Sequence, residues 1–313
     1  DIALLQYTGG TTGKSKAAIL THKNLLSNVQ QVSNWIEPYI KPGEEIIITA
    51  LPLFHIFSFT VNCLTFLKIG AENVLIANPR DLKSFLKVLK KKKFTVMTAV
   101  NTLFNLLLTS KTFKELNFSS FKFSVGGGMA VMSETAKNWK KVTGTNITQG
   151  YGLTETSPVV SINKIDSLYN GSIGLPVQST NIKIIDENGE KINDKQPGEL
   201  CVKGPQVMSG YWKYPEDQEN PFTDDGFFKT GDIASINDDG YLTIVDRKKD
   251  MIISSGYNVF PNELEDYLST HPGILEAGVI GIPDKNRGEY IKAFVVKKNK
   301  NLLDTEVITY CKE

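Results

Sequence analysis

Strand-like and helix-like segments alternate through the first half of the chain, and this alternation restricts the fold more than any single residue does. Short apolar runs typical of buried strands are separated by segments whose apolar residues recur every three to four positions, as in helices with one buried face. We expect strands over residues 46–51, 94–100 and 121–125 and helices beginning near Thr21, Asp81, Thr102 and Ser133. The alternation predicts an α/β fold on a doubly wound, mostly parallel sheet covered on both faces.

From about Gly171 the chain changes to short β-rich segments broken by turn pairs such as Asn188-Gly189 and Asp239-Gly240. These pairs are typical of hairpins and predict a small antiparallel β subdomain. A charged segment then precedes a strand, a helix and two further strands, which is an α+β pattern. The expected divisions are 1–170 for the α/β part, 171–246 for the β-rich subdomain, 247–250 for the connection and 251–313 for a small C-terminal α+β domain.

The segment from Tyr7 to Lys16 is rich in residue types that bind phosphate, namely Thr8, Gly9, Gly10, Thr11, Thr12, Gly13, Lys14 and Lys16. Glycine lets backbone N–H groups approach a polyanion, threonine adds hydroxyl donors and lysine adds positive charge. A Walker A loop is the obvious alternative, but its first glycine would fall at Thr8, and no helix opens after Lys14. Residues 2–7 and 17–20 read as strands, so we expect a glycine-rich hairpin over a nucleotide.

Charge, cysteine and hydropathy patterns exclude several classes of protein. The 35 basic and 34 acidic residues are interspersed and leave a net charge of +1, so no overall field attracts nucleic acid. Three cysteines far apart favour a reduced, cytoplasmic compartment, and three scattered histidines lack metal-ligand spacing. The apolar region 46–71 is interrupted by Pro52, His55 and Asn62, so we expect a buried strand and helix there and not a membrane span.

Three further segments carry polar chemistry that a core does not need: Gln-Gly-Tyr-Gly-Leu-Thr-Glu-Thr over residues 149–156, Thr-Gly-Asp over 230–232 and Asp-Arg-Lys-Lys-Asp over 246–250. With the glycine-rich segment, in this order, they resemble the adenylate-forming superfamily of acyl-CoA synthetases, amino-acid adenylation domains and luciferases. The resemblance covers nearly the whole chain and looks most like the bacterial long-chain fatty acid–CoA ligases. The departures at Gly9, Ser15 and Ala17 keep small residues and remove no lysine or threonine hydroxyl.

This resemblance implies a ligase that uses ATP, Mg²⁺ and CoA. A fatty acid would attack the α-phosphate of ATP to give acyl-AMP and pyrophosphate, and the acyl group would then pass to CoA. Three alternatives stay open: a fatty acyl-AMP ligase that loads a carrier protein, a luciferase-like oxygenase, and a non-catalytic nucleotide- or acyl-binding module. Intact Lys14, Lys16, Glu155, Asp232 and Arg247 argue against the last of these.

The resemblance also assigns individual residues. Glu155 would hold Mg²⁺, which typically uses one or two protein carboxylates together with substrate phosphates, and Thr154 would donate to the α-phosphate. Asp232 would accept from the ribose hydroxyls, and Arg247 would bind ribose or phosphate. The remaining nucleotide-site candidates in this part of the chain are Gly127, Gly128, Tyr151 and Gly152, with Tyr151 packing on the adenine. The alternative interpretations are a surface glutamate at position 155 and an ordinary core tyrosine at position 151.

The substrate class follows from a missing charge. Amino-acid adenylation domains place an aspartate near residues 53–57 to hold the α-ammonium, whereas this chain has Leu-Phe-His-Ile-Phe there, which favours an apolar acid. His55 would gate the acyl channel, the alternative being a core histidine with its hydrogen bonds satisfied. The glycines at 126–128 are expected to leave room for an alkyl chain.

Two further expectations concern the end of the chain. Lys249 lies where the family hinges its C-terminal unit between adenylation and thioester formation, and Gly256 would let the pantetheine arm of CoA pass. The resemblance begins at the phosphate segment and lacks the family's C-terminal lysine, so residues 1–313 alone are expected to be inactive. It leaves open a peripheral association with the cytoplasmic face of the inner membrane and a homodimer.

Overall fold

The computed structural model describes residues 1–8, 15–193, 195–214, 220–284, 287–298 and 301–312. The chain forms two compact units, the first over residues 1–183, 201–230 and 236–243 and the second over 184–200, 231–235 and 244–313. Both units draw on the β-rich region expected over residues 171–246. This division follows spatial compactness, so the domain boundaries taken from the sequence remain predictions.

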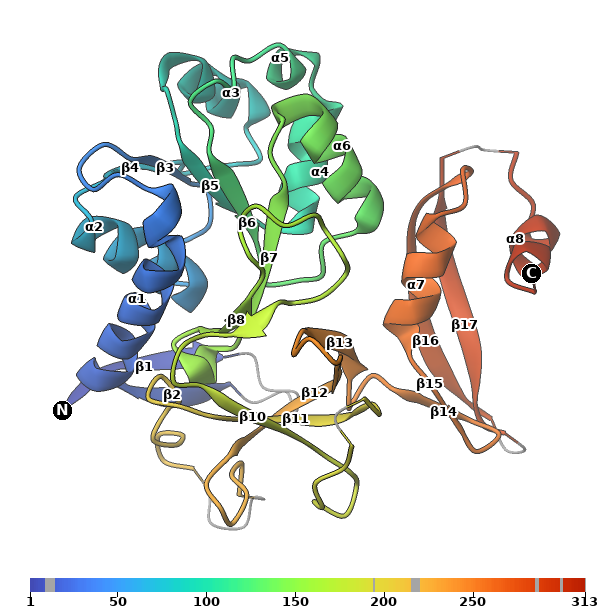
Figure 1. Cartoon of the computed structure of the whole chain (residues 1–313). Helices are drawn as coiled ribbons and strands as arrows, with labels where there is room; N and C mark the ends of the chain where they lie inside the picture. Colours follow the sequence, from blue (N-terminus) through green and yellow to red (C-terminus); the bar gives the residue numbers. More distant parts are fainter. Residues whose placement is uncertain (9–14, 194, 215–219, 285–286, 299–300, 313) are drawn as a thin grey trace. The chain divides into compact units, whose positions relative to one another are not determined.

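A mixed sheet is the main element of the first unit (Figure 1). In the described part of the chain its order is β4-β3-β5-β6-β7-β8-β9, with parallel pairing from β4 to β7 and antiparallel pairing at β8 and β9. The strands are β3 (Ile46–Thr49), β4 (Glu72–Leu75), β5 (Val96–Ala99), β6 (Phe123–Gly126), β7 (Ile147–Gly152), β8 (Val159–Ile162) and β9 (Leu175–Pro176). The expected mostly parallel sheet is confirmed.

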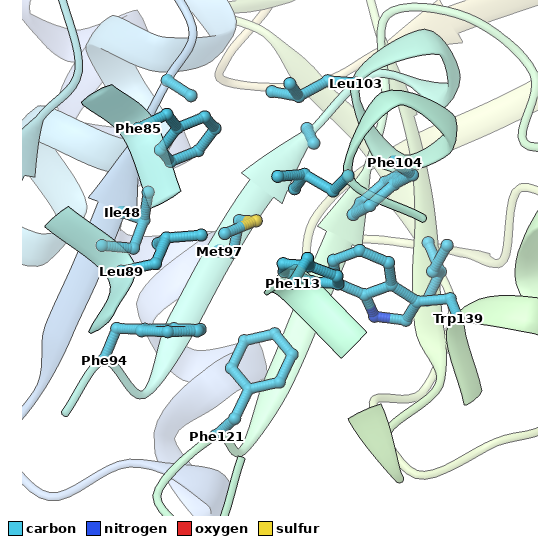
Figure 2. Close-up of a cluster of buried hydrophobic side chains, with 14 of the residues drawn as sticks. Ile48, Phe85, Leu89, Phe94, Met97, Leu103, Phe104, Phe113, Phe121 and Trp139 are labelled. Carbon is cyan, nitrogen blue, oxygen red and sulfur yellow. The ribbon is translucent and has the colours of Figure 1, made fainter. Parts of the chain in front are cut away.

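Helical segments cover both faces of this sheet. They are α1 (His22–Ile36), η1 (Glu37–Tyr39), the π-helix η2 (Ser58–Thr65), α2 (Phe66–Lys68), α3 (Leu82–Lys91), α4 (Asn101–Thr109), α5 (Lys111–Lys114) and α6 (Ser133–Thr143). The short 3-10 turn η3 (Thr154–Thr156) follows β7. Because successive strand residues point to opposite faces, Ile48 packs in a cluster with side chains of α3, α4 and α6, whereas Ile47 packs with those of α1 and η2. Figure 2 shows the first cluster. In it the rings of Trp139 and Phe104 meet edge to face, with their centroids 4.6 Å apart.

The glycine-rich segment joins two antiparallel strands, β1 (Ile2–Thr8) and β2 (Lys16–Thr21). Thr8 pairs with Lys16, and residues 9–14 between them lie outside the described residues. Helix α1 begins only after β2, and the Thr21 side chain caps it by accepting from the Asn24 amide at 3.2 Å. The two-strand prediction is therefore confirmed, and the Walker A alternative, which needs a helix directly after Lys14, is excluded.

The apolar region 46–71 departs from a regular helix. The helix expected within this region begins at Ile56, and over Ser58–Thr65 it is a π-helix. The buried Asn62 side chain of this π-helix donates to Thr49 Oγ1 and accepts from Thr98 Oγ1, each at 2.9 Å, so polar contacts with two strands accompany its irregular winding. Among the described residues, no helix is both long enough and apolar enough to cross a membrane.

Four more strands lie side by side in the order β10-β11-β12-β13. They are β10 (Asn181–Ile185), β11 (Gly198–Lys203), β12 (Phe228–Ile236) and β13 (Leu242–Arg247). The turn glycines Gly189 and Gly240 have φ of +83° and +82°, a left-handed conformation that glycine adopts without strain. The predicted turn pairs thus lie between consecutive strands of this sheet.

A sheet of order β15-β14-β17-β16 belongs to the second unit. Its strands are β14 (Ile252–Ser254), β15 (Tyr257–Val259), β16 (Ile274–Asp284) and β17 (Gly288–Lys297), and the helices of this region are α7 (Pro261–Ser269) and α8 (Asp304–Tyr310). Ile252, Leu268, Val279 and Leu302 form a small core between them. The expected α+β pattern is confirmed.

Candidate active site

Several predicted site residues meet at one edge of the main sheet. Strands β3, β5, β6 and β7 are parallel, with Thr49 opposite Thr98, Ala99 opposite Gly126, and Gly126 opposite Gln149. The segments that follow these strands therefore emerge at the same carboxyl edge, which is where open α/β sheets bind ligands. They carry His55, Gly127, Gly128 and residues 151–155.

Glu155 lies in η3, directly after β7, and only 7% of it is exposed. Its Oε1 accepts a hydrogen bond from the Tyr211 hydroxyl at 2.6 Å, and its backbone oxygen accepts from the Met208 amide at 2.7 Å. The alternative of a surface glutamate is therefore ruled out, because a segment more than fifty residues away along the chain packs against the turn. Within the described residues, no lysine or arginine forms an ion pair with this buried carboxylate.

Tyr211 is a site residue that sequence reasoning missed. Its ring lies 5.2 Å from the ring of Tyr214, and the Lys16 ammonium lies 5.3 Å and 5.1 Å from the two ring centroids. Lys16 Nζ also donates to Tyr214 Oη at 3.5 Å. Burial, and then the nearby Glu155 charge, raise the pKa of Tyr211 well above its ordinary value, so its hydroxyl stays protonated. The segment after Gly210 carries no motif that signals this contact.

Tyr151 and Gly152 end strand β7, and Thr154 opens η3; all three are half-buried. A Cβ on Gly152 would lie 2.1 Å from the Pro158 carbonyl oxygen, so the backbone packing alone requires glycine there. Tyr151 pairs with Ser161 of β8. The structure thus gives Gly152 a packing role, while its predicted contact with a nucleotide stays a prediction.

The three glycines at the end of β6 and directly after it offer less space than expected. A Cβ on Gly126 would meet side-chain carbons of Val131 at 2.6 Å and Ile147 at 2.9 Å, so the expectation of room for an alkyl chain is wrong at this position. At Gly127 a Cβ would lie 3.3 Å from both the Gly150 oxygen and the Phe57 ring. Gly128 is exposed, and its φ of +79° explains why glycine stands there.

His55 is exposed, which rules out the alternative of a core histidine. Its Nδ1 accepts from the Phe57 amide at 3.2 Å, so the neutral ring carries its proton on Nε2. Partial desolvation of the ring lowers the pKa of His55 below its ordinary value, in keeping with that neutral form. Beside it, Phe54 is 80% exposed, an apolar surface at the same edge of the sheet.

The second unit holds the predicted ribose site. Asp232 on β12 is buried at 8% exposure, and Arg247 Nε on β13 lies 3.8 Å from its Oδ1. The buried Glu199 supports this pair: its Oε1 accepts from the Gly231 amide at 3.2 Å and its Oε2 from Lys248 Nζ at 2.8 Å. Glu199 was missed, although a carboxylate in the otherwise apolar run Leu200-Cys201-Val202 signals a buried partner.

Lys249 and Gly256 lie in turns of the second unit. Lys249 is exposed in a turn after β13, in which the Asp250 amide donates to the Arg247 oxygen at 3.0 Å. Gly256 has φ of +83° and, with Ser255 at +54°, forms the two-residue turn between the paired residues Ser254 and Tyr257. Such turns need positive φ, so the hairpin accounts for the glycine, and its role toward CoA stays a prediction.

The structure leaves two predicted features without a geometric account. Gly9, Gly10, Thr11, Thr12, Gly13 and Lys14 lie outside the described residues. In the part of the chain that is described, no group of three or more histidine, cysteine, aspartate or glutamate side chains could hold a metal ion by itself. A metal at Glu155 would therefore need ligands from a substrate.

Comparison with models of known protein families identifies the family of the chain. The family model of AMP-binding enzymes matches residues 1–212, and the model of the AMP-binding enzyme C-terminal domain matches residues 263–313. The chain belongs to the AMP-binding enzyme family. The resemblance drawn from the four motifs is thereby confirmed.

The relatives of this AMP-binding enzyme include a long-chain-fatty-acid–CoA ligase of Escherichia coli, which is 51% identical over 100% of this chain and 56% of that protein. ATP-bound MatB from Rhodopseudomonas palustris matches 100% of this chain and 61% of its own with a TM-score of 0.90 and 31% identity. The o-succinylbenzoate CoA synthetase of Bacillus subtilis, in complex with ATP and a magnesium ion, matches with a TM-score of 0.85 and 31% identity. This match covers 100% of this chain and 63% of that one. The expected fold is confirmed, and the chain spans a little over half the length of the E. coli relative.

Proposed function

We propose that this AMP-binding enzyme is an ATP-dependent long-chain fatty acid–CoA ligase. The observation that carries the proposal is the 51% identity, over the entire chain, to a long-chain-fatty-acid–CoA ligase. The site supports it, because the exposed apolar side chain of Phe54 and a neutral histidine lie at the same carboxyl edge of the sheet as a buried carboxylate. No aspartate stands at residues 53–57 to hold the ammonium of an amino acid.

The donor set at Glu155 fits Mg²⁺. The Glu155 carboxylate is 7% exposed, accepts from a tyrosine hydroxyl and has no cationic partner in the described residues, so its oxygens are not occupied by a lysine or arginine there. One protein carboxylate with phosphate oxygens from the substrate is how magnesium is commonly held. When bound, the ion would neutralise charge on the triphosphate. A related structure contains ATP and magnesium.

In the first half-reaction, a carboxylate oxygen of the fatty acid attacks the α-phosphorus of ATP, and the bond to the bridging oxygen of pyrophosphate breaks. Thr154 beside Glu155 would donate a hydrogen bond to the α-phosphate, and Lys16 would add positive charge. Asp232 would accept from the ribose hydroxyls, with Arg247 binding ribose or phosphate. Positioning and charge neutralisation of this kind supply most of the catalysis in phosphoryl transfer.

In the second half-reaction, the CoA thiolate attacks the acyl carbon and AMP leaves with the former carboxylate oxygen. Lys249 in its exposed turn would be the pivot between the two half-reactions, and the turn at Gly256 would line the path of the pantetheine arm. A cytoplasmic location, a peripheral membrane association and a homodimer remain predictions, which cell fractionation, vesicle flotation and analytical ultracentrifugation test.

Product analysis tests the proposal. The complete natural chain that contains this sequence is incubated with ATP, Mg²⁺, a chain-length panel of fatty acids and either CoA or acyl carrier protein, and the products are identified by mass spectrometry. We expect acyl-CoA, AMP and pyrophosphate, with long chains preferred. Acyl-carrier product with none on CoA, or accumulation of acyl-AMP alone, would overturn the assignment of the acceptor.

A further inference from the structure

We propose that Tyr211 is a positioning residue that holds the Glu155 carboxylate with its hydroxyl and the Lys16 ammonium against the face of its ring. The inference rests on the proposed function, since it assigns the two charges to the metal and to the phosphates of ATP. It adds a residue from a segment that carries none of the four motifs.

Backbone hydrogen bonds hold the segment around Tyr211 both to strand β2 and to the turn that carries Glu155. Residues Ala17 and Ile19 of β2 bond with the segment 209–212: the Trp212 amide donates to the Ala17 oxygen at 2.8 Å, and the Ile19 amide donates to the Gly210 oxygen at 2.9 Å. The Met208 amide donates to the Glu155 backbone oxygen at 2.7 Å. One short segment therefore ties the strand that follows the glycine-rich residues to the turn that carries the carboxylate.

The hydroxyl and the ring face of Tyr211 contact groups of opposite charge. The hydroxyl donates to Glu155 Oε1 at 2.6 Å, while the ring face, with that of Tyr214, meets the Lys16 ammonium at 5.3 Å and 5.1 Å. Aromatic faces attract cations, and a hydroxyl donor stabilises an anion. The structure accordingly contains no ion pair between the described residues Lys16 and Glu155. Each charge stays available to an incoming substrate.

A matched pair of variants separates this role from ordinary packing. Tyr211→Phe removes the hydroxyl at Glu155 and keeps the ring over Lys16. Tyr214→Phe removes the neighbouring hydroxyl, which contacts Lys16 and not Glu155. Glu155→Gln serves as the reference for loss of the metal carboxylate, and Glu155→Gln combined with Tyr211→Phe completes a double-mutant cycle.

The measured quantity is the affinity of the complete natural chain for Mn²⁺, a probe for Mg²⁺, in the presence of a non-hydrolysable ATP analogue. Free Mn²⁺ is monitored by its electron paramagnetic resonance signal. Because a hydrogen bond to a charged group is strong, Tyr211→Phe should weaken Mn²⁺ binding about tenfold, whereas Tyr214→Phe should change it less than about twofold. In the Glu155→Gln background, Tyr211→Phe should add less than about twofold.

Wild-type Mn²⁺ affinity in Tyr211→Phe, equal losses in both tyrosine variants, or additive losses in the cycle would overturn the proposal. Tyr211→Phe removes a single oxygen and keeps the ring that packs beside Tyr214, so we expect it to fold, and circular dichroism verifies this for each variant before binding is compared. The assay uses neither fatty acid nor CoA. A failure to form acyl-CoA would therefore refute the proposed function without deciding the role of Tyr211. Unchanged Mn²⁺ binding in Tyr211→Phe would refute that role without deciding the proposed function.

Discussion

Replacing Glu155 separates catalysis from folding, provided the replacement is chosen for the environment that the structure reveals. The carboxylate is 7% exposed and accepts from the Tyr211 hydroxyl. Glu155→Ala would remove the charge and also leave the hydroxyl of the half-buried Tyr211 without this acceptor. Glu155→Gln removes the charge and keeps a carbonyl oxygen at the position that Tyr211 needs, so it is the cleaner variant.

The two variants should differ in stability and agree in rate. An unpaired buried donor costs about 1–3 kcal/mol, so we expect the free energy of unfolding to fall by that amount in Glu155→Ala and by less than about 1 kcal/mol in Glu155→Gln. Loss of one preorganised electrostatic partner costs about 10²–10³ in rate, or roughly 3–4 kcal/mol of barrier. Both variants should therefore lose adenylation activity to this extent.

Adenylation is measured by ATP–pyrophosphate exchange with a long-chain fatty acid at saturating Mg²⁺, and stability by urea unfolding. The complete natural chain is used for both. Exchange by Glu155→Gln within about tenfold of wild type, a deficit of only 1.4 kcal/mol, would refute the metal role. Equal stability of the Ala and Gln variants would instead refute the structural importance of the Tyr211 contact.

Two other predictions concern the hinge and the pH dependence of stability. Lys249→Pro fixes φ in the exposed turn after β13. The rate of acyl-AMP formation should stay within about tenfold of wild type, while the rate of thioester formation should fall far more. Rapid-quench measurements of each half-reaction test this, and equal losses in both would place the hinge elsewhere. Burial by itself raises the pKa of Glu45. The opposing effect is larger: Lys122 acts through a hydrogen bond and its charge, and Thr95 and the Lys41 amide donate hydrogen bonds. The pKa of Glu45 therefore lies below its ordinary value. This carboxylate therefore stabilises the fold above its unfolded pKa of about 4.3, and the contribution is lost as pH falls through the lower folded pKa. Urea unfolding between about pH 6 and pH 3 should show a weaker pH dependence in Lys122→Met than in wild type, and parallel curves would contradict the assignment.

Local signals in the sequence predicted the elements that local chemistry determines. Thr21 marks the beginning of α1, because its side chain accepts from a backbone amide at that helix end. The apolar runs predicted the parallel strands β3, β5 and β6, since both faces of the sheet are buried there. The π-helix and strand β7 were not predicted, because neither contains a simple period.

The missed site residues depend on contacts between distant segments. Tyr211 meets Glu155 across 56 positions, and Lys248 meets Glu199 across 49, so no short pattern encodes either pair. The same packing makes Glu155 buried where its polar neighbours suggested a surface loop. Gly126 shows the converse error, because a glycine suggests space that the side chains of Val131 and Ile147 fill.

Oxygen labelling tests the central claim most directly. The complete natural chain is incubated with ATP, Mg²⁺, CoA and a long-chain fatty acid carrying ¹⁸O in both carboxylate positions, and AMP and acyl-CoA are examined by mass spectrometry. Attack of the carboxylate on the α-phosphorus predicts one ¹⁸O in AMP and one in the thioester carbonyl. ADP as the nucleotide product, or AMP without the label, would contradict an acyl-adenylate and with it the function proposed for this chain.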